Sequence, residues 1–488
     1  MFKNYNTKFL KGNLFHFGIL VLLVYLVVFV KLDAFHIRWW DESMFAVNAY
    51  EMIENGKWFS LYYDGNPDLF NTKPPLTVWL QVFFIKILGY NELAIRLPSA
   101  LATAIVILTL FHFVSKYFNR TWAWISSLVL LTSNGFIGFH TGRTGDSDAL
   151  LTMFLFLANL EFLKFILSEQ KKHLLWFFLL ITLAFATKLY AALLFAPAYF
   201  ILLLVFRKLK CFIFNIQFTV GILFFIFVSG FIIYFRELDS KGYIDIILGK
   251  DAGRIFSIIE GHSGSWSYYI ESLFKERFSI WFIPLVAGTF LNIFNPSELQ
   301  KKIIFSSVGL ILVYLILVSI STTKLEWYDM PLYPYMALVA SYSIYLLYEK
   351  TQSSMHKRTA LVGSSFLLLL FIFPYYLMFS KSQSNRIPDG QRFHEGKEMY
   401  LFGKIESGEN LDGLLIYHDD YVGSLLFYKY KLRENGQDIK TTNQINFRVD
   451  DKVLFNSSHV QKIETKYNFK VIDSTEFVKV VVINEKLE

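Results

Sequence analysis

Apolar segments long enough to cross a lipid bilayer recur along most of this 488-residue chain. A bilayer core about 30 Å thick is crossed by roughly 20 residues of α-helix, because each residue adds about 1.5 Å. We therefore expect an all-α polytopic membrane protein. The eleven predicted spans are residues 14–32, 93–117, 121–139, 147–167, 173–187, 189–206, 212–234, 277–294, 302–320, 327–348 and 359–379.

One further apolar run, residues 74–89, is shorter and is interrupted by Pro74, Pro75, Gln81 and Lys86. We expect it to form a helix that lies in the membrane interface or is only partly inserted. If it were a full span, every later loop would lie on the opposite side of the membrane, unless another span has been missed. The expected number of transmembrane helices is therefore eleven, with thirteen as the upper limit.

The composition excludes several classes of protein. Hydrophobic residues make up 54% of the chain and charged residues 18%, whereas soluble domains carry about 25% charged residues. A disordered protein or a simple soluble enzyme is therefore excluded. The single cysteine, Cys211, excludes a disulfide framework and any cysteine-based metal site.

Basic residues predict the orientation of the spans. We expect the first apolar segment to be a retained span rather than a signal peptide, because it is long and no cleavage site follows it. Short basic loops alternate along the chain, and such loops are typical of the cytoplasmic side. These loops contain Lys116 and Arg120, Lys171 and Lys172, Arg207, Lys208 and Lys210, Lys301 and Lys302, and Lys357 and Arg358. The N-terminus should then be cytoplasmic.

The remaining loops should lie on the outer side, and two of them, residues 33–73 and 236–276, are long enough to carry structure. Residues 381–488 change to a mixed-charge composition with β-type runs at 414–417 and 478–483. We predict two domains: a transmembrane domain over residues 1–380 and a small periplasmic α/β domain over residues 381–488.

Charged residues gather where the predicted spans meet the outer side. Asp41 and Glu42 follow two tryptophans that suit the membrane boundary, although they could also be a solvated acidic turn that caps the next helix. Lys73 precedes Pro74 and Pro75. It could be an interface anchor, or a rigidly held cation that binds the phosphate of a lipid.

A third group begins at His140 and continues through Arg143 and Asp146 to Asp148, directly before an apolar run. Carboxylates at this depth are often functional, but a helix cap with a dipole contact explains them equally well. Lys188 and Lys324 lie at two more outer junctions, the second close to Tyr328. Together with Lys73 they make the outer side unusually rich in lysine, and a bound phosphate would explain that.

This combination predicts a site for a lipid-linked phosphate with a polar head group. The sequence shows no phosphate-binding glycine loop, no Ser-His-Asp order, no Cys/His zinc cluster and no nucleic-acid-binding signature. We therefore expect no nucleic acid partner. Among the histidines, His262 in the loop 236–276 is the strongest candidate. That loop could close over a bound donor or be a plain connector.

The ordered motifs resemble one family of membrane enzymes. They are Asp41-Glu42, Gly56-Lys57-Trp58, Lys73-Pro74-Pro75-Leu76, Gly89-Tyr90-Asn91-Glu92, Arg96-Leu97-Pro98-Ser99-Ala100, the segment from Arg143 to Asp148, and Lys324-Leu325-Glu326-Trp327-Tyr328. The chain is similar to GT-C superfamily glycosyltransferases of the protein O-mannosyltransferase and lipid A aminoarabinose transferase type. The similarity is clear over residues 35–200, patchy to about residue 350, and absent from the tail.

The resemblance implies an integral membrane enzyme that takes a sugar from a polyprenyl-phosphate donor, with inversion at the anomeric carbon. Asp41 matches the family's catalytic aspartate, Asp148 its second acidic position, with Asp146 as the competing candidate, and Lys73 the lysine that binds the donor phosphate. The aminoarabinose transferases have an acidic residue immediately before that lysine, where this chain has Thr72. A metal site that uses this position is therefore in doubt.

The chemistry of the residues suggests the same roles. Asp41 is the expected base for the acceptor hydroxyl. Lys73 and Lys324, with Arg143 or Lys188, would stabilise the leaving phosphate. Glu42 and Asp146 could orient the base, hold a divalent cation or contact sugar hydroxyls. His262 and Tyr328 complete the predicted substrate-binding residues.

We thus expect a glycosyltransferase of the bacterial inner membrane that acts on the periplasmic face. Its partners would be a polyprenyl-phosphate-sugar donor, membrane lipids, and a lipid A or other glycolipid, glycan or protein acceptor. A divalent cation is left open as a cofactor. The alternative is a transporter or flippase of lipid-linked sugars, which would need charged residues deep within its spans.

Overall fold

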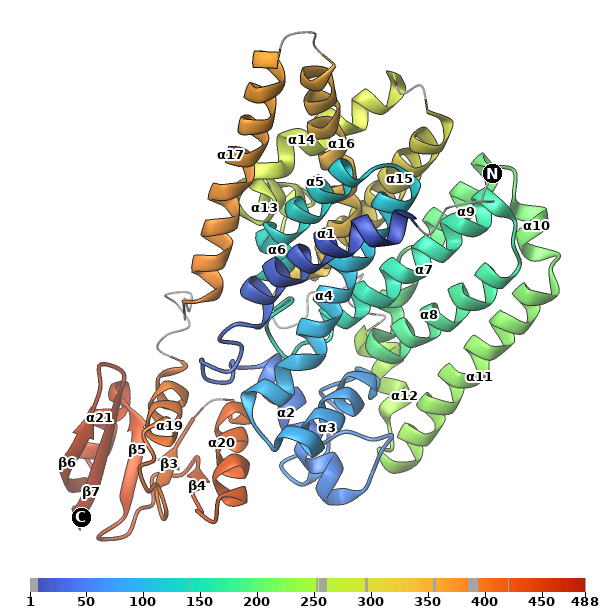
Figure 1. Cartoon of the computed structure of the whole chain (residues 1–488). Helices are drawn as coiled ribbons and strands as arrows, with labels where there is room; N and C mark the ends of the chain where they lie inside the picture. Colours follow the sequence, from blue (N-terminus) through green and yellow to red (C-terminus); the bar gives the residue numbers. More distant parts are fainter. Residues whose placement is uncertain are drawn as a thin grey trace.

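The computed structural model describes residues 8–138, 140–251, 253, 261–294, 297–353, 357–384, 394–419 and 421–487. Helices occupy each of the eleven predicted spans (Figure 1). They are α1 Lys8–Val24, α4 Glu92–Tyr117, α5 Arg120–Leu131, α7 Asp148–Ser168, α8 Lys172–Lys188, α9 Ala196–Val205, α11 Ile216–Asp239, α14 Ser279–Leu291, α15 Glu298–Ile320, α16 Tyr333–Gln352 and α17 Lys357–Ser382.

The chain is an integral membrane protein. Among the described residues, six helices are long and apolar enough to cross a bilayer: α4, α7, α8 with the turn that follows it, α11, α15 and α17. Shorter apolar helices include α9, α14 and α3 Leu76–Leu88, the helix predicted to lie in the interface. The total of eleven crossings stays a prediction.

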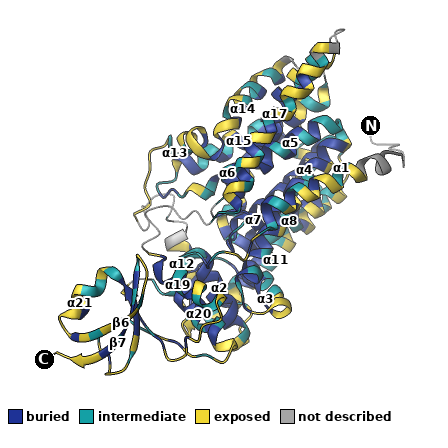
Figure 2. Ribbon diagram, turned by 60° about the vertical axis from the view of Figure 1, so that its left-hand side comes forward, coloured by how far each residue is buried: buried dark blue, intermediate teal, exposed yellow. Residues whose placement is uncertain are grey.

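The spanning helices divide into central and peripheral ones. In an apolar 18-residue stretch of α7, 72% of the residues are buried, whereas in the corresponding stretches of α11 and α17 only 17% and 22% are buried. Figure 2 shows the same contrast, with α4 and α7 dark and much of α17 bright. Large apolar side chains such as Phe227 and Leu361 are exposed on the peripheral helices. A surface of this kind suits contact with lipid tails.

Several helices are shorter than the predicted spans, among them α5, α9 and α14. In the segment 121–139, α5 ends at Leu131, and the short helix α6 Asn134–Ile137 follows. The hydroxyls of Thr132 and Ser133 donate to the carbonyls of Leu128 and Val129 at this end, which are hydrogen bonds that favour a break in the helix.

The predicted span 327–348 begins later than expected, at Tyr333. The preceding residues Glu326–Leu332 form a 3₁₀ segment that contains Pro331. Proline cannot donate a backbone hydrogen bond and is well tolerated only in the first turn of an α-helix, which is where Pro334 lies.

Short elements connect the spans. Helix α2 Asp41–Asn55 and the hairpin of β1 Tyr62–Tyr63 and β2 Asn66–Pro67 lie between α1 and α3. The others are α10 Leu209–Ile213, α12 Tyr243–Ile246 and α13 Tyr268–Ser272. In the long loop 236–276, residues 252 and 254–260 lie outside the described residues, so closure of this loop over a donor stays a prediction.

A small α/β domain follows α17, as the β-type runs predicted. Its five-stranded sheet has the order β4-β3-β5-β7-β6, with parallel pairing of β3 to β4 and β5 and antiparallel pairing along β5, β7 and β6. The strands are β3 Leu415–Tyr417, β4 Lys440–Thr442, β5 Lys452–Asn456, β6 Tyr467–Ser474 and β7 Val478–Lys486, and the helices are α19 Gly396–Glu406, α20 Gly423–Glu434 and α21 Val460–Glu464.

This C-terminal domain packs against α2, which lies beside α3 at one end of the bundle (Figure 1). Apolar side chains of α2, such as Phe45 and Ala49, share one buried cluster with Leu425 and Phe427 of α20. Burying a shared apolar surface stabilises the contact by roughly 25 cal/mol per Å². The start of α2 is thereby held between the spanning helices and the C-terminal domain.

Candidate active site

Glu42 organises the start of α2. Its side chain is fully buried, and Arg96 of α4 donates to it from Nε at 2.8 Å and from Nη2 at 3.0 Å. The backbone N–H groups of Arg38 and Gly145 donate to the same carboxylate, each at 2.7 Å. Burial raises the pKa of Glu42, but Arg96 and these N–H groups outweigh it, so the pKa lies below 4.5. An ionised Glu42 thus joins α2, α4 and the loop 140–147.

Asp41 is the first residue of α2 and faces Lys73. The Nζ atom of Lys73 lies 3.6 Å from Oδ1 of Asp41 and 5.0 Å from the centre of the Phe45 ring. The side chain of Asp41 is 16% exposed and that of Lys73 is 20% exposed, so a substrate can still reach both. The structure therefore brings these two predicted residues together.

The loop that carries Lys73 is held from α11. Arg236 is fully buried and donates to the carbonyl oxygens of Asp68, Asn71 and Lys73. The Tyr243 hydroxyl donates to the carbonyl of Thr72 at 2.8 Å, and its ring lies 4.1 Å from the Arg236 guanidinium carbon. These backbone contacts fix the position of Lys73 before α3 begins.

Asp146 lies in the loop that Glu42 holds through Gly145. The Thr144 hydroxyl donates to Asp146 Oδ2 at 2.5 Å, and Nδ1 of His140 lies 3.3 Å from the same oxygen. The His140 ring stacks on Trp327 with the ring centres 3.9 Å apart. Burial lowers the pKa of His140, but the Asp146 carboxylate, with Asp41 and Asp148, outweighs it and raises the pKa above 6.5.

Asp148 begins α7 and pairs with Lys188, the last residue of α8. The Nζ–Oδ1 distance is 2.6 Å, and the same Nζ lies 5.1 Å from the centre of the Tyr328 ring. Tyr328 directly follows Trp327, on which His140 stacks, and Asp146 lies two residues before Asp148. The two ion pairs, Asp41–Lys73 and Asp148–Lys188, are thus connected through His140 and Asp146, which lie close to Asp41.

Three of these residues could hold a divalent cation. One ligand atom each from Asp41, His140 and Asp146 lies within 4.8 Å of the other two. Carboxylate oxygens with one imidazole nitrogen are a donor set that several divalent metals accept. Glu42, the other residue that the sequence suggested for a cation, lies outside this group because its carboxylate is occupied by Arg96 and backbone N–H groups.

Three predicted substrate-binding residues have structural contacts instead. Arg143 donates to the carbonyls of Val27, Val28, Val30 and Lys31, which lie in and just after the π-helical turn Tyr25–Phe29 that follows α1, and its burial lowers its pKa to about 10. Lys324 donates from Nζ to the carbonyls of Ser319 and Ser321, which is how a cation caps the end of α15. His262 is exposed, and its carbonyl accepts from the Lys324 N–H at 3.1 Å.

The sequence singled out His262, but the histidine that contacts the acidic cluster in the structure is His140. A signal for His140 was present: it opens the segment that ends at Asp148. Arg96 opens one of the motifs that resemble the family, but the sequence did not reveal that it pairs with Glu42 or that Arg236 holds the loop before α3, because these partners are distant in the sequence.

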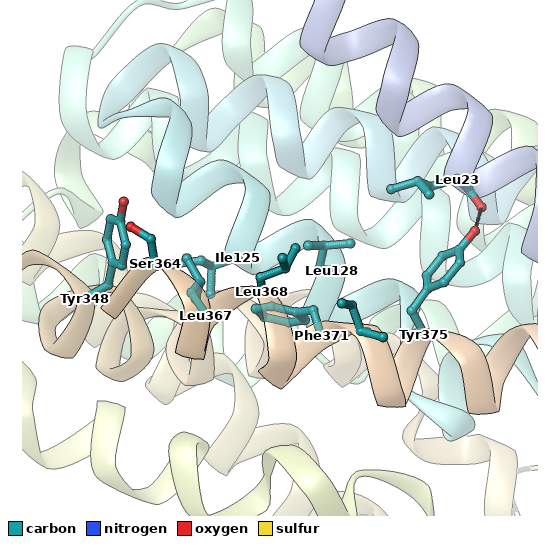
Figure 3. Close-up of a pocket in the computed structure, with 10 residues that line it drawn as sticks. Leu23, Ile125, Leu128, Tyr348, Ser364, Leu367, Leu368, Phe371 and Tyr375 are labelled. Carbon is teal, nitrogen blue, oxygen red and sulfur yellow. Dashed lines mark hydrogen bonds between the residues drawn. The ribbon is translucent and has the colours of Figure 1, made fainter. Parts of the chain in front are cut away.

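A separate apolar groove of about 430 Å³ lies between α17 and α5. Leu367, Leu368 and Phe371 line it from α17, and the Tyr375 hydroxyl at one end donates to the Leu23 carbonyl at 3.1 Å (Figure 3). None of the residues that line it carries a charge. The groove is therefore not the candidate active site.

Comparisons with known proteins agree with this architecture. Residues 72–234 match the model of the dolichyl-phosphate-mannose-protein mannosyltransferase family. An uncharacterized protein of Aquifex aeolicus is 25% identical over 330 residues, which cover 66% of this chain and 63% of that protein. The undecaprenyl phosphate-alpha-4-amino-4-deoxy-L-arabinose arabinosyl transferase of Shewanella sediminis is 28% identical over 115 residues, which cover 24% of this chain and 20% of that protein.

The fold also matches a solved structure. The crystal structure of ArnT from Cupriavidus metallidurans bound to undecaprenyl phosphate superposes with a TM-score of 0.70, covering 95% of this chain and 97% of that chain at 16% identity. At this identity the likeness concerns the fold. The predicted fold class and the resemblance to GT-C superfamily glycosyltransferases are confirmed.

Proposed function

We propose that this protein is a glycosyltransferase of the GT-C superfamily that moves a sugar from a polyprenyl-phosphate donor to a hydroxyl group of a cell-envelope acceptor, on the periplasmic face of the bacterial inner membrane. One observation carries the proposal: the ion pairs Asp41–Lys73 and Asp148–Lys188 both adjoin the loop 140–147, whose His140 and Asp146 side chains lie close to Asp41. The similar ArnT of Cupriavidus metallidurans binds undecaprenyl phosphate, which is a lipid of the required class.

The two lysines suit the leaving group of this reaction. When the bond between the anomeric carbon and the phosphate oxygen breaks, the polyprenyl phosphate keeps the electron pair and gains negative charge. Lys73 and Lys188 carry the ammonium groups of the two ion pairs. Both groups can interact electrostatically with the phosphate as its negative charge grows. Preorganised cations of this kind stabilise a transition state most strongly where water is scarce.

Asp41 suits the role of general base. Its side chain is 16% exposed, whereas those of Asp148 and Asp146 are 4% and 2% exposed. An acceptor hydroxyl can therefore approach Asp41 most easily and pass its proton to that carboxylate as its oxygen attacks the anomeric carbon. Attack from the side opposite the phosphate inverts that carbon.

The remaining members of the cluster would bind or position the sugar. Asp146 is held by Thr144 and His140, and Asp148 is held by Lys188. Tyr328 lies beside Lys188 and offers an aromatic wall to the head group. We assign no direct contact with substrate to Glu42, Arg143, Lys324 or His262.

The test uses the purified full chain in lipid nanodiscs with polyprenyl phosphates that carry a labelled hexose or pentose. Lipid A, glycan and protein acceptors are added separately, and the products are identified by mass spectrometry. We expect free polyprenyl phosphate and one glycosylated acceptor class in equal amounts. A sugar that stays attached to its lipid but reaches the other leaflet would instead identify a flippase.

A further inference from the structure

The C-terminal domain contacts the residues that lead into Asp41. Glu395 accepts from the Trp39 N–H at 3.3 Å, and His36 Nε2 lies 2.7 Å from its carboxylate. The Tyr428 hydroxyl accepts from the N–H of Ile37 at 3.0 Å. The segment 36–39 is therefore fastened to a domain that lies more than 350 residues later in the chain.

The next residue, Trp40, has an unusual backbone. Its φ of 76° and ψ of −115° lie in a region that residues with a side chain rarely adopt. Such a conformation is strained and persists only where the surroundings impose it. Because Asp41 follows directly, the Trp40 backbone sets the direction in which α2 starts and in which the Asp41 carboxylate points.

The carbonyl oxygen of Trp40 accepts three hydrogen bonds. Two come from the first turn of α2 itself, from the Met44 N–H and the Ser43 hydroxyl, both at 2.9 Å. The third comes from the Tyr421 hydroxyl of the C-terminal domain at 3.0 Å. The Tyr421 ring also packs on the Trp40 indole, with the ring centres 4.6 Å apart. Tyr421 thus contacts both the peptide and the side chain of the strained residue.

We propose that Tyr421 is a positioning residue that holds Trp40 in its strained conformation and thereby aims Asp41 at the acceptor hydroxyl. This inference rests on the proposed function of Asp41 as the base. It makes the docked C-terminal domain a part of the catalytic apparatus, although Tyr421 acts only through Trp40.

The test compares Tyr421→Phe with Tyr430→Phe in the full chain. Tyr430 is a matched control, because its hydroxyl also crosses from the C-terminal domain to α2, where it donates to Glu51 at 2.7 Å. Loss of one hydrogen bond on a strained peptide should lower kcat about tenfold in Tyr421→Phe, with the KM for the donor unchanged. Tyr430→Phe should keep the wild-type kcat.

Amide hydrogen exchange of residues 36–44 gives a readout that is independent of activity. Exchange should be faster in Tyr421→Phe than in the wild type, and unchanged in Tyr430→Phe. Wild-type kcat and wild-type exchange in Tyr421→Phe, or equal losses in both variants, would overturn the inference. A wild-type protein that transfers no sugar would overturn the proposed function instead, and the exchange measurement would still decide whether Tyr421 holds this segment.

Discussion

The Nζ atom of Lys188 lies 2.6 Å from Oδ1 of Asp148, which joins the last residue of α8 to the first residue of α7. Asp41 is likewise the first residue of its helix, α2, and it pairs with Lys73, which lies in the loop before α3. In each pair the carboxylate also benefits from the positive N-terminal end of its helix. Without substrate, the two aspartates thus neutralise the two lysines. A bound phosphate can replace the aspartates as the anionic partner of the lysines.

Removing Lys188 should destabilise the protein. Lys188→Met leaves Asp148 buried without its cation, and breaking a buried ion pair from one side costs about 3–5 kcal/mol. Thermal unfolding in detergent measures the effect. The double variant Asp148→Asn/Lys188→Met should recover most of the loss, because no uncompensated charge remains.

Lys208→Met is the control for Lys188→Met. Lys208 pairs with Glu169, which is half exposed, and such pairs contribute less than about 1 kcal/mol. Equal losses in the two lysine variants would show that Asp148–Lys188 is an ordinary surface pair.

Replacing Glu42 should loosen the loop that carries Asp146. Glu42→Gln removes the charge opposite Arg96 and weakens the bond from the Gly145 N–H, so residues 140–147 should exchange their amide protons faster and transfer should slow. Glu54→Gln, at the exposed end of the same helix, should change neither quantity. Unchanged exchange in Glu42→Gln would refute its positioning role.

Glu398 should make stability depend on pH. Burial raises the pKa of this carboxyl group in the C-terminal domain from 4.5 to about 7. Between these values the folded state binds a proton that the unfolded state lacks, so stability falls as the pH rises, by about 3 kcal/mol in total. We expect the thermal midpoint of the full chain to decrease from pH 5 to pH 8.

Glu398→Gln isolates this contribution, because an amide keeps the bond to the Ser424 hydroxyl but does not titrate. As the pH rises, the thermal midpoint of Glu398→Gln should increase relative to that of the wild type. Parallel pH profiles for the two proteins would contradict the assignment.

The helical architecture could be predicted because apolar segments of spanning length are a local property of the sequence. Two of the helices that are shorter than predicted have a local cause: the hydroxyls of Thr132 and Ser133 at the end of α5, and Pro331 before α16. Charged residues at the ends of apolar segments also stand out, and for this reason Asp41, Lys73, Asp148 and Lys188 could be named from the sequence.

What the sequence could not reveal is which charged groups have partners among distant backbone atoms. Arg143 and Lys324 look as available as Lys73, but carbonyl groups of residues that follow α1 and of the end of α15 occupy them. The contact between Tyr421 and Trp40 joins two domains, and no local pattern predicts it.

The most direct test of the account is the transfer rate of Asp41→Asn, measured with a labelled polyprenyl-phosphate sugar in nanodiscs. Asparagine keeps the size of the side chain but cannot accept the acceptor's proton, and general-base catalysis contributes about 10²–10⁴-fold. We predict a loss of kcat in that range with an unchanged thermal midpoint. Wild-type kcat in a correctly folded Asp41→Asn protein would contradict the account.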